Sequence, residues 1–231
     1  MKTRYLSPKE AYNIIAPKYD GWIWQRFWKN NEYPLIRKWC GKLPIGTGLD
    51  IGTGTGNNLD CFLQRGNRID AIDISSEMLK LCIQKHANYI ENGQLSCYEK
   101  DINQFWTEEK KYNWIISNRV FSHIEYLDVV IANLTKMLKY GGMCFFSDIH
   151  PQHDYKHTHM VIDDEDIVIK SYKHSIKELK SIFINNSFKI ISLKEIRKEQ
   201  LLDGGIMKDF PHSYRSDSPF FYYCILRYEG K

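Results

Sequence analysis

Several common features are missing from these 231 residues. No apolar run is long enough to cross a membrane, and the first eight residues lack the apolar segment of a secretory leader. The six cysteines include no C-x-x-C pair and mostly stand in apolar runs, which favours reduced core thiols over disulfides or a zinc site. These absences together predict a cytoplasmic protein.

An excess of one charge is missing too. The 32 Lys and Arg residues face 28 Asp and Glu residues, and the two signs are interleaved along the chain. Without a basic stripe, the composition does not favour a nucleic-acid partner. A hydrophobic fraction of 43% and an aromatic fraction of 14% predict a compact globular protein.

The most distinctive stretch is an apolar run that leads into three alternating glycines. Residues 48–51 read as a buried strand and residues 57–63 as a helix, with Gly52, Gly54 and Gly56 between them. Glycine lets the backbone approach a ligand with no Cβ in the way, and a helix N-terminus presents unpaired N–H groups. The stretch therefore predicts a nucleotide-type cofactor site on an α/β sheet.

Strand and helix patterns alternate through residue 150. We expect a doubly wound, mostly parallel, Rossmann-like sheet of seven strands, with ligands at the carboxyl ends of the strands. After residue 150 the pattern indicates a hairpin over 158–162 and 167–172, with an exposed tip at 163–166, and then a helix over 174–186. Strands over 188–193 and 220–228, joined by a long loop around Gly204-Gly205, Pro211, His212 and Tyr214, predict an antiparallel last strand and an antiparallel edge.

We expect one domain over residues 1–231. Its parts are an N-terminal helical lid over 1–42, a cofactor-binding core over 43–149, an insert over 150–174 and the C-terminal part of the sheet over 175–231. The aromatic side chains of residues 8–40 fit helices that are simply packed on the domain, or a lid over the ligand in which Tyr19 takes part.

Three polar residues narrow the choice of cofactor. A dinucleotide-binding G-x-G-x-x-G motif would need glycine at Asn57. Asp50, at the end of the strand, would repel a pyrophosphate and suit a ligand with an ammonium and a sulfonium, unless it only binds backbone N–H groups near the next helix. Asp73 follows the next strand at the spacing of an acid that binds ribose hydroxyls.

On these residues the chain resembles the class I S-adenosylmethionine-dependent methyltransferases, in their small-molecule and ubiquinone-biosynthesis-like branch. The resemblance is carried by residues 49–56, 71–75, 101–102 and 139–142, and by an opening Tyr12 to Asp20 helix that covers the cofactor in that branch. It implies S-adenosyl-L-methionine as the cofactor. The residues that we expect to bind it are Tyr19, Asp50, Gly52, Gly54, Asp73, Ile74, Asp101, Ile102 and Asn118.

The acceptor side offers candidate bases. His150 follows the fifth strand, where acceptors bind, and His123 and Tyr172 are further catalytic candidates, although His123 and His174 also fit structural roles at helix starts. Four histidines between 150 and 159 stand in a polar loop with no cysteine nearby, so we expect no metal site.

The leading hypothesis is transfer of a methyl group from S-adenosylmethionine to an O or N nucleophile of a small-molecule substrate, with no nucleic acid and no membrane as partner. One alternative is cyclisation of the cofactor to azetidine-2-carboxylate with release of methylthioadenosine. Another is a non-catalytic cofactor-binding protein. A dehydrogenase is disfavoured by Asn57 and Asp50.

Overall fold

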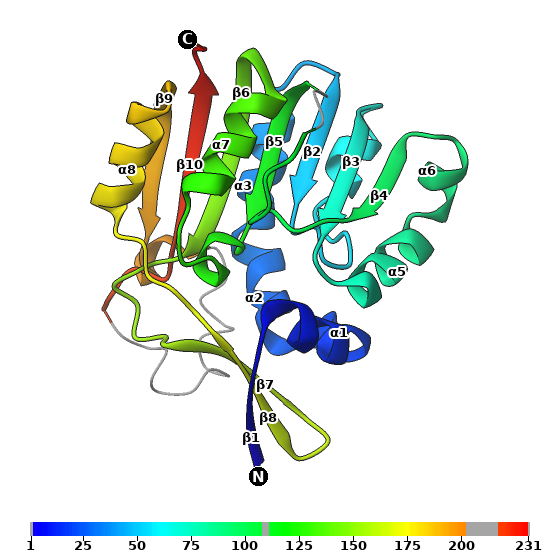
Figure 1. Ribbon diagram of the computed structural model, residues 1–231, viewed down its shortest axis with the longest axis vertical. Coiled ribbons are helices and arrows are strands. Elements are labelled where there is room, and N and C mark those ends of the chain that lie inside the picture. The colour runs from blue at the N-terminus through cyan, green and yellow to red at the C-terminus, as the bar shows by residue number, and fades with distance from the viewer. Residues whose placement is uncertain (1, 108–110, 202–216, 231) are drawn as a thin grey trace.

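A computed structural model describes residues 2–107, 111–201 and 217–230, and a seven-stranded sheet forms its centre (Figure 1). The strand order is β4-β3-β2-β5-β6-β10-β9. The strands are β2 (Thr47–Ile51), β3 (Arg68–Asp73), β4 (Leu95–Glu99), β5 (Tyr112–Asn118), β6 (Leu138–Ile149), β9 (Phe188–Ile196) and β10 (Phe221–Tyr228). Neighbours pair parallel except around β10, which confirms the predicted α/β fold and its antiparallel last strand.

The last two strands pair antiparallel at the edge of the sheet, as predicted. β10 lies between β6 and β9 and pairs antiparallel with both, so β9 is the edge strand. The connection from β6 to β9 leaves a gap one strand wide, and β10 fills it. Most of the predicted loop before β10, with Gly204-Gly205, Pro211, His212 and Tyr214, lies outside the described residues.

Helices cover both faces of this sheet. One apolar core joins the strands to α7 (Asp128–Met137) and α8 (Ile176–Asn185), and a second joins them to α3 (Tyr33–Cys40) and α4 (Asp60–Leu63). The remaining helices are α1 (Pro8–Tyr19), α2 (Ile23–Asn31), α5 (Ser76–Lys85) and α6 (Ala87–Glu91), with short 3-10 turns η1 (Phe121–His123) and η2 (Lys198–Gln200). No helix in the described ranges has the length and apolar character needed to span a bilayer. All six cysteines carry free thiols.

Helix starts follow local capping signals. Ser7 caps α1 and forms a capping box with Glu10, and Ser75 caps α5 by accepting from the backbone N–H of Met78. Ser175, not His174, caps α8. The His174 ring instead contacts the backbone carbonyl of Ile124 through Nε2 at 2.8 Å, which ties the end of the insert to η1.

A second, three-stranded sheet lies below the carboxyl ends of the main strands (Figure 1). The predicted hairpin forms β7 (His157–Ile162) and β8 (Glu165–Lys170), with the turn at Asp163-Asp164 alone, so the acidic tip is shorter than expected. β1 (Lys2–Leu6), which the sequence analysis missed, pairs parallel with β8. Apolar residues of this sheet pack against α1, so the insert and the N-terminal helix form one unit.

Candidate functional site

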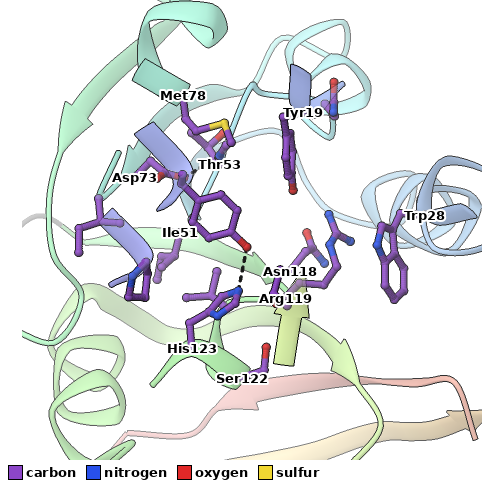
Figure 2. Close-up of a pocket in the computed structure, with 18 of the residues that line it drawn as sticks. Tyr19, Trp28, Ile51, Thr53, Asp73, Met78, Asn118, Arg119, Ser122 and His123 are labelled. Carbon is purple, nitrogen blue, oxygen red and sulfur yellow. Dashed lines mark hydrogen bonds between the residues drawn. The ribbon is translucent and has the colours of Figure 1, made fainter. Parts of the chain in front are cut away.

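A large cavity opens at the carboxyl ends of β2, β3 and β5, under α1 and α2 (Figure 2). The sequence-predicted residues that line it are Tyr19, Gly52, Gly54, Asp73, Ile74, Asp101, Ile102, Asn118 and His123. Asp50, His150 and Tyr172 do not line it. The structure thus brings most of the predicted cofactor residues together in one cavity. Of the predicted catalytic residues, only His123 lines that cavity.

The surroundings of the three glycines of the turn differ in how much room they leave for a side chain. All three have positive φ, which other residues adopt only with strain. A Cβ on Gly52 would lie 2.2 Å from Val120 Cγ2, and one on Gly56 would lie 2.7 Å from Cys82 Sγ. A Cβ on Gly54 would meet nothing closer than the Tyr19 ring at 3.8 Å. Gly54 is therefore the position where the backbone itself faces open cavity.

The helix that follows the turn is shorter than expected. α4 begins only at Asp60 and has four residues. A long helix N-terminus therefore does not contribute to the site, and the backbone N–H groups of residues 52, 53, 54 and 56 donate to acceptors within the protein.

Asp50 lies beneath the glycine turn. Its side chain accepts a hydrogen bond from Thr53 Oγ1 at 2.7 Å, and the residue is 2% exposed. Burial raises the pKa of Asp50 to about 7, against the lowering effect of the Thr53 hydroxyl. The carboxylate therefore braces the turn, and the predicted direct contact with a cationic ligand does not fit its position.

Asp73 connects the turn to the next strand and faces the cavity. One carboxylate oxygen accepts from the backbone N–H of Gly54 at 2.8 Å, and the other accepts from the N–H of Ser75 at 2.9 Å. Burial raises the pKa of Asp73, and these two backbone hydrogen bonds counteract the shift. Each oxygen keeps a second lone pair, so the group can still accept from a vicinal diol.

A short loop after β4 closes the same end of the cavity. Asp101 Oδ1 accepts from the backbone N–H of Asn103 at 2.8 Å, which forms a tight turn. Trp106 Nε1 donates to the Asp101 carbonyl at 2.9 Å and fixes the loop from behind. Asp101 and Ile102 are thereby presented to the ligand on a rigid turn.

A buried polar network supports the opposite wall, and sequence reasoning missed its central member, Glu32. Glu32 is 1% exposed; its carboxylate accepts from Ser147 Oγ at 2.6 Å and pairs with the guanidinium of Arg119. Asn118 donates to Ser147 Oγ at 2.6 Å and accepts from Asn58 at 3.1 Å. No local pattern marks Glu32, because its partners lie on β5 and β6, far along the chain.

Arg119 takes a strained backbone conformation directly after β5. Its φ of 59° is one that residues other than glycine adopt at a cost of about 1–3 kcal/mol. The backbone N–H donates to the Ser147 carbonyl at 2.8 Å, and the guanidinium carbon lies 4.8 Å from the centre of the Trp28 ring. These contacts hold the side chain in the cavity wall (Figure 2).

The C-terminal end of α1 is fastened to the glycine turn, as expected of a lid. Asp20 accepts from Thr55 Oγ1 at 2.6 Å and from Asn57 Nδ2 at 2.9 Å, and it pairs with Lys85 at 2.8 Å. These hydrogen bonds lower the pKa of Asp20 despite its partial burial. Tyr19 is thereby placed over Gly54.

His123 lies in the cavity wall and is bonded to the lid. Its Nε2 lies 2.8 Å from Tyr12 Oη, and the two rings meet edge to face (Figure 2). Burial lowers the pKa of His123 to about 4 and raises the pKa of Tyr12 well above its ordinary value. The pair joins lid and core, and His123 is a weak proton acceptor at neutral pH.

His150 and Tyr172, predicted as catalytic candidates, lie outside the lining of the cavity. His150 Nε2 lies 2.9 Å from Glu195 Oε2, and Nδ1 accepts from the backbone N–H of Gln152. Both residues line a small neighbouring pocket, which shares Ser122, Ile149 and Tyr155 with the cavity. Position along the strand indicated the right end of the sheet, but alternation of side chains at the strand end turned His150 away.

The other histidines near the insert do not gather. His153 lines the cavity, and burial lowers its pKa to about 4, whereas His157 and His159 lie on β7. Within the described ranges, no three His, Cys, Asp or Glu side chains are arranged to hold a metal ion.

Known proteins resemble this chain in sequence. Residues 49–144 fit the model of a family described as a methyltransferase domain. The chain is 29% identical over 152 residues to malonyl-[acyl-carrier protein] O-methyltransferase 2 of Ilyobacter polytropus, which covers 64% of this chain and 57% of that protein. It is 23% identical over 131 residues to demethylmenaquinone methyltransferase of Thermobifida fusca, covering 55% of this chain and 53% of that protein. The chain thus spans little more than half the length of these relatives.

Solved structures share the fold. The DhpI-SAH complex has a TM-score of 0.69 at 16% identity and covers 96% of this chain and 95% of its own. An S-adenosylmethionine-dependent methyltransferase from Clostridium acetobutylicum has a TM-score of 0.65 at 15% identity and covers 95% of this chain and 99% of its own. The methyltransferase-domain match, these relatives and the shared fold all support the predicted resemblance to the class I S-adenosylmethionine-dependent methyltransferases.

The contacts that hold the end of α1 to the glycine turn can be tested directly. We expect Asp20→Ala to weaken the binding of S-adenosylhomocysteine by about 10-fold, because two hydrogen bonds from Thr55 and Asn57 and one from Lys85 of α5 to the end of α1 are lost. Titration calorimetry measures the change. Lys18→Ala is the matched control, since the Lys18–Asp163 pair on the same helix is exposed and should leave the affinity unchanged. Equal affinity of the Asp20 variant and the wild type would contradict a lid role.

Proposed function

We propose that this protein is an enzyme that transfers a methyl group from S-adenosyl-L-methionine to an O or N nucleophile of a small molecule. The observation that carries the proposal is the joint placement of the open Gly54 turn and the Asp73 carboxylate in one cavity at the carboxyl ends of β2 and β3. We further propose that residues 1–231 act as one domain.

The donor side of the cavity fits this cofactor. Asp73 has lone pairs for the ribose hydroxyls, and the Asp101-Ile102 turn gives one polar and one apolar partner for the adenine. The open backbone at Gly54 leaves room for the methionine part, with the Tyr19 ring above it. When bound, the cofactor supplies an electrophilic methyl group.

The protein's own contribution is then alignment and exclusion of water. α1 covers the cavity through its Asp20 and Tyr12 contacts, and aromatic rings of α2 line the side away from the donor. An in-line displacement needs its two reacting atoms at a short, fixed distance, and a lid that is bonded to the core helps to provide this. The rings best placed to align the reactants and exclude water are those of Tyr19, Tyr12 and Trp28.

A second candidate acceptor is an acyl group carried on a protein. Several relatives are named malonyl-[acyl-carrier protein] O-methyltransferases, including one from Priestia megaterium. The same acyl group offered as a free acid and as a carrier-protein thioester separates the two possibilities by their kcat/KM.

Two experiments test the proposal. Calorimetry should detect binding of S-adenosylhomocysteine and none of NAD, and preferential binding of NAD would overturn the assignment. Incubation with methyl-labelled S-adenosylmethionine and an acceptor panel should give labelled product and S-adenosylhomocysteine. Release of methylthioadenosine without acceptor would instead favour the cyclisation alternative, and tight binding with no turnover on any acceptor would favour a cofactor-binding protein.

The placement of His150 gives a clear prediction. We expect His150→Ala to keep methyl transfer within about twofold of the wild type, because its ring bonds Glu195 and does not line the cavity. Turnover measured with a saturating acceptor checks this. A loss of more than 10-fold in kcat, with the melting temperature unchanged, would return His150 to the catalytic site.

A further inference from the structure

The acceptor side of the cavity combines one cation with an apolar wall. The Arg119 guanidinium stands in the cavity wall beside Asn118 and near the Trp28 ring (Figure 2). Trp22, Trp24, Phe27, Trp28 and Phe220 line the same region. A ligand that fills this space therefore meets aromatic faces along its body and a guanidinium at one end.

The ion pair with Glu32 does not block Arg119 from a ligand. The Glu32 side chain is 2% exposed and does not line the cavity, whereas the Arg119 side chain is 18% exposed and does. One terminal nitrogen of Arg119 donates to Glu32, and a guanidinium carries five N–H groups in a planar fork. Glu32 thus holds the guanidinium from behind and leaves donors for an anion in front.

Neither histidine among the described residues that line the cavity is a good base. Burial lowers the pKa of both His123 and His153 to about 4, and Tyr12 is bonded to His123. His150 faces away. An acceptor that arrives protonated, such as a phenol or an ammonium with a pKa near ~10, would need a base to remove its proton. An acceptor that is already ionised at neutral pH would not.

Resting on the proposed methyl transfer, we propose that the acceptor atom is a carboxylate oxygen of an acid with an apolar body, bound by Arg119, which Glu32 positions. The oxygen forms a bond to the methyl carbon as the carbon–sulfur bond breaks. The electron pair of that bond goes to sulfur, which becomes the neutral thioether of S-adenosylhomocysteine, and the carboxylate becomes a neutral ester. No proton moves. An ammonium acceptor is disfavoured twice, by its proton and by the charge of Arg119.

The acceptor class is tested with straight-chain fatty acids of varied length, 3-phenylpropanoic acid, and the matched 3-phenylpropanol and 3-phenylpropylamine. Methyl esters release labelled methanol in mild alkali, whereas ethers and methylamines do not. We expect alkali-labile label from acids only. Label only in the alcohol or amine would overturn the carboxylate inference and leave methyl transfer intact. Failure to bind S-adenosylhomocysteine would instead overturn the proposed function.

The role of Arg119 is tested by binding as well as by turnover. We expect Arg119→Met to weaken the binding of the best acid to the S-adenosylhomocysteine-saturated protein, and to lower kcat/KM, by about 10-fold or more, with Arg119→Lys between Met and wild type. Glu32→Gln should raise KM more than it lowers kcat. The affinity for S-adenosylhomocysteine and the melting temperature report whether each variant is folded. Acid binding that is equal in a folded Arg119→Met and the wild type, or no acid binding at all, would overturn the inference.

Discussion

We expect Asp73→Asn to lose at least ~100-fold in affinity for S-adenosylhomocysteine. Both carboxylate oxygens already accept from the backbone, one from Gly54 and the other from Ser75. An asparagine has one acceptor oxygen and one NH₂ group, so one of these buried N–H groups would face another donor. We therefore expect the substitution to have two effects at once. It distorts the glycine turn, and it weakens the proposed contact with the ribose. Titration calorimetry measures the loss.

Asp70→Asn is the matched control for this experiment. Asp70 lies on the same strand, is 6% exposed, and accepts from Tyr112 Oη at 2.6 Å, but it does not line the cavity. We expect the control to lower the melting temperature and to keep the affinity within about threefold. If Asp73→Asn binds S-adenosylhomocysteine as the wild type does, or if both variants lose affinity equally, Asp73 is not the ribose ligand.

The second large effect concerns stability. We expect Gly48→Ala to lower the free energy of unfolding by about 3 kcal/mol or more. A Cβ on Gly48 would lie 2.1 Å from two atoms of the Trp114 ring. That ring cannot move aside easily, because it stacks on Phe62 with centroids 4.4 Å apart and meets Trp39 edge to face. Urea denaturation monitored by circular dichroism gives the value.

A glycine with open space provides the comparison. A Cβ on Gly66 would meet nothing within 4 Å, although its φ is +87°, so Gly66→Ala should cost only backbone strain, about 1 kcal/mol. If overlap with the ring is the cause at Gly48, the double variant Gly48→Ala/Trp114→Leu will be more stable than the sum of its single variants predicts. Simple additivity would show that another contact is responsible.

The parts of the site that sequence reasoning located are those with short-range signals. The strand before Gly52 and the acid at the end of β3 were found because hydrophobic runs and turn residues report on their immediate neighbours. The same logic located the hairpin insert. Patterns of this kind were sufficient to predict the fold class and most of the residues on the donor side of the cavity.

The errors have a common cause, which is that a side chain's direction depends on distant packing. Asp50 turns under the loop to meet Thr53, and His150 turns outward to meet Glu195. β1 has no marked apolar pattern and is a strand because β8 gives it a partner.

The sequence by itself determined the alternation of strands and helices, the glycine turn and the acid beside it, because each depends on residues only a few positions apart. Tertiary structure alone decided the acceptor side of the cavity. Glu32 and Arg119 are 87 positions apart, and they meet because α2 and α3 pack over the ends of β5 and β6. Burial there also removes the nearby histidines as bases, since a charge is costly away from water.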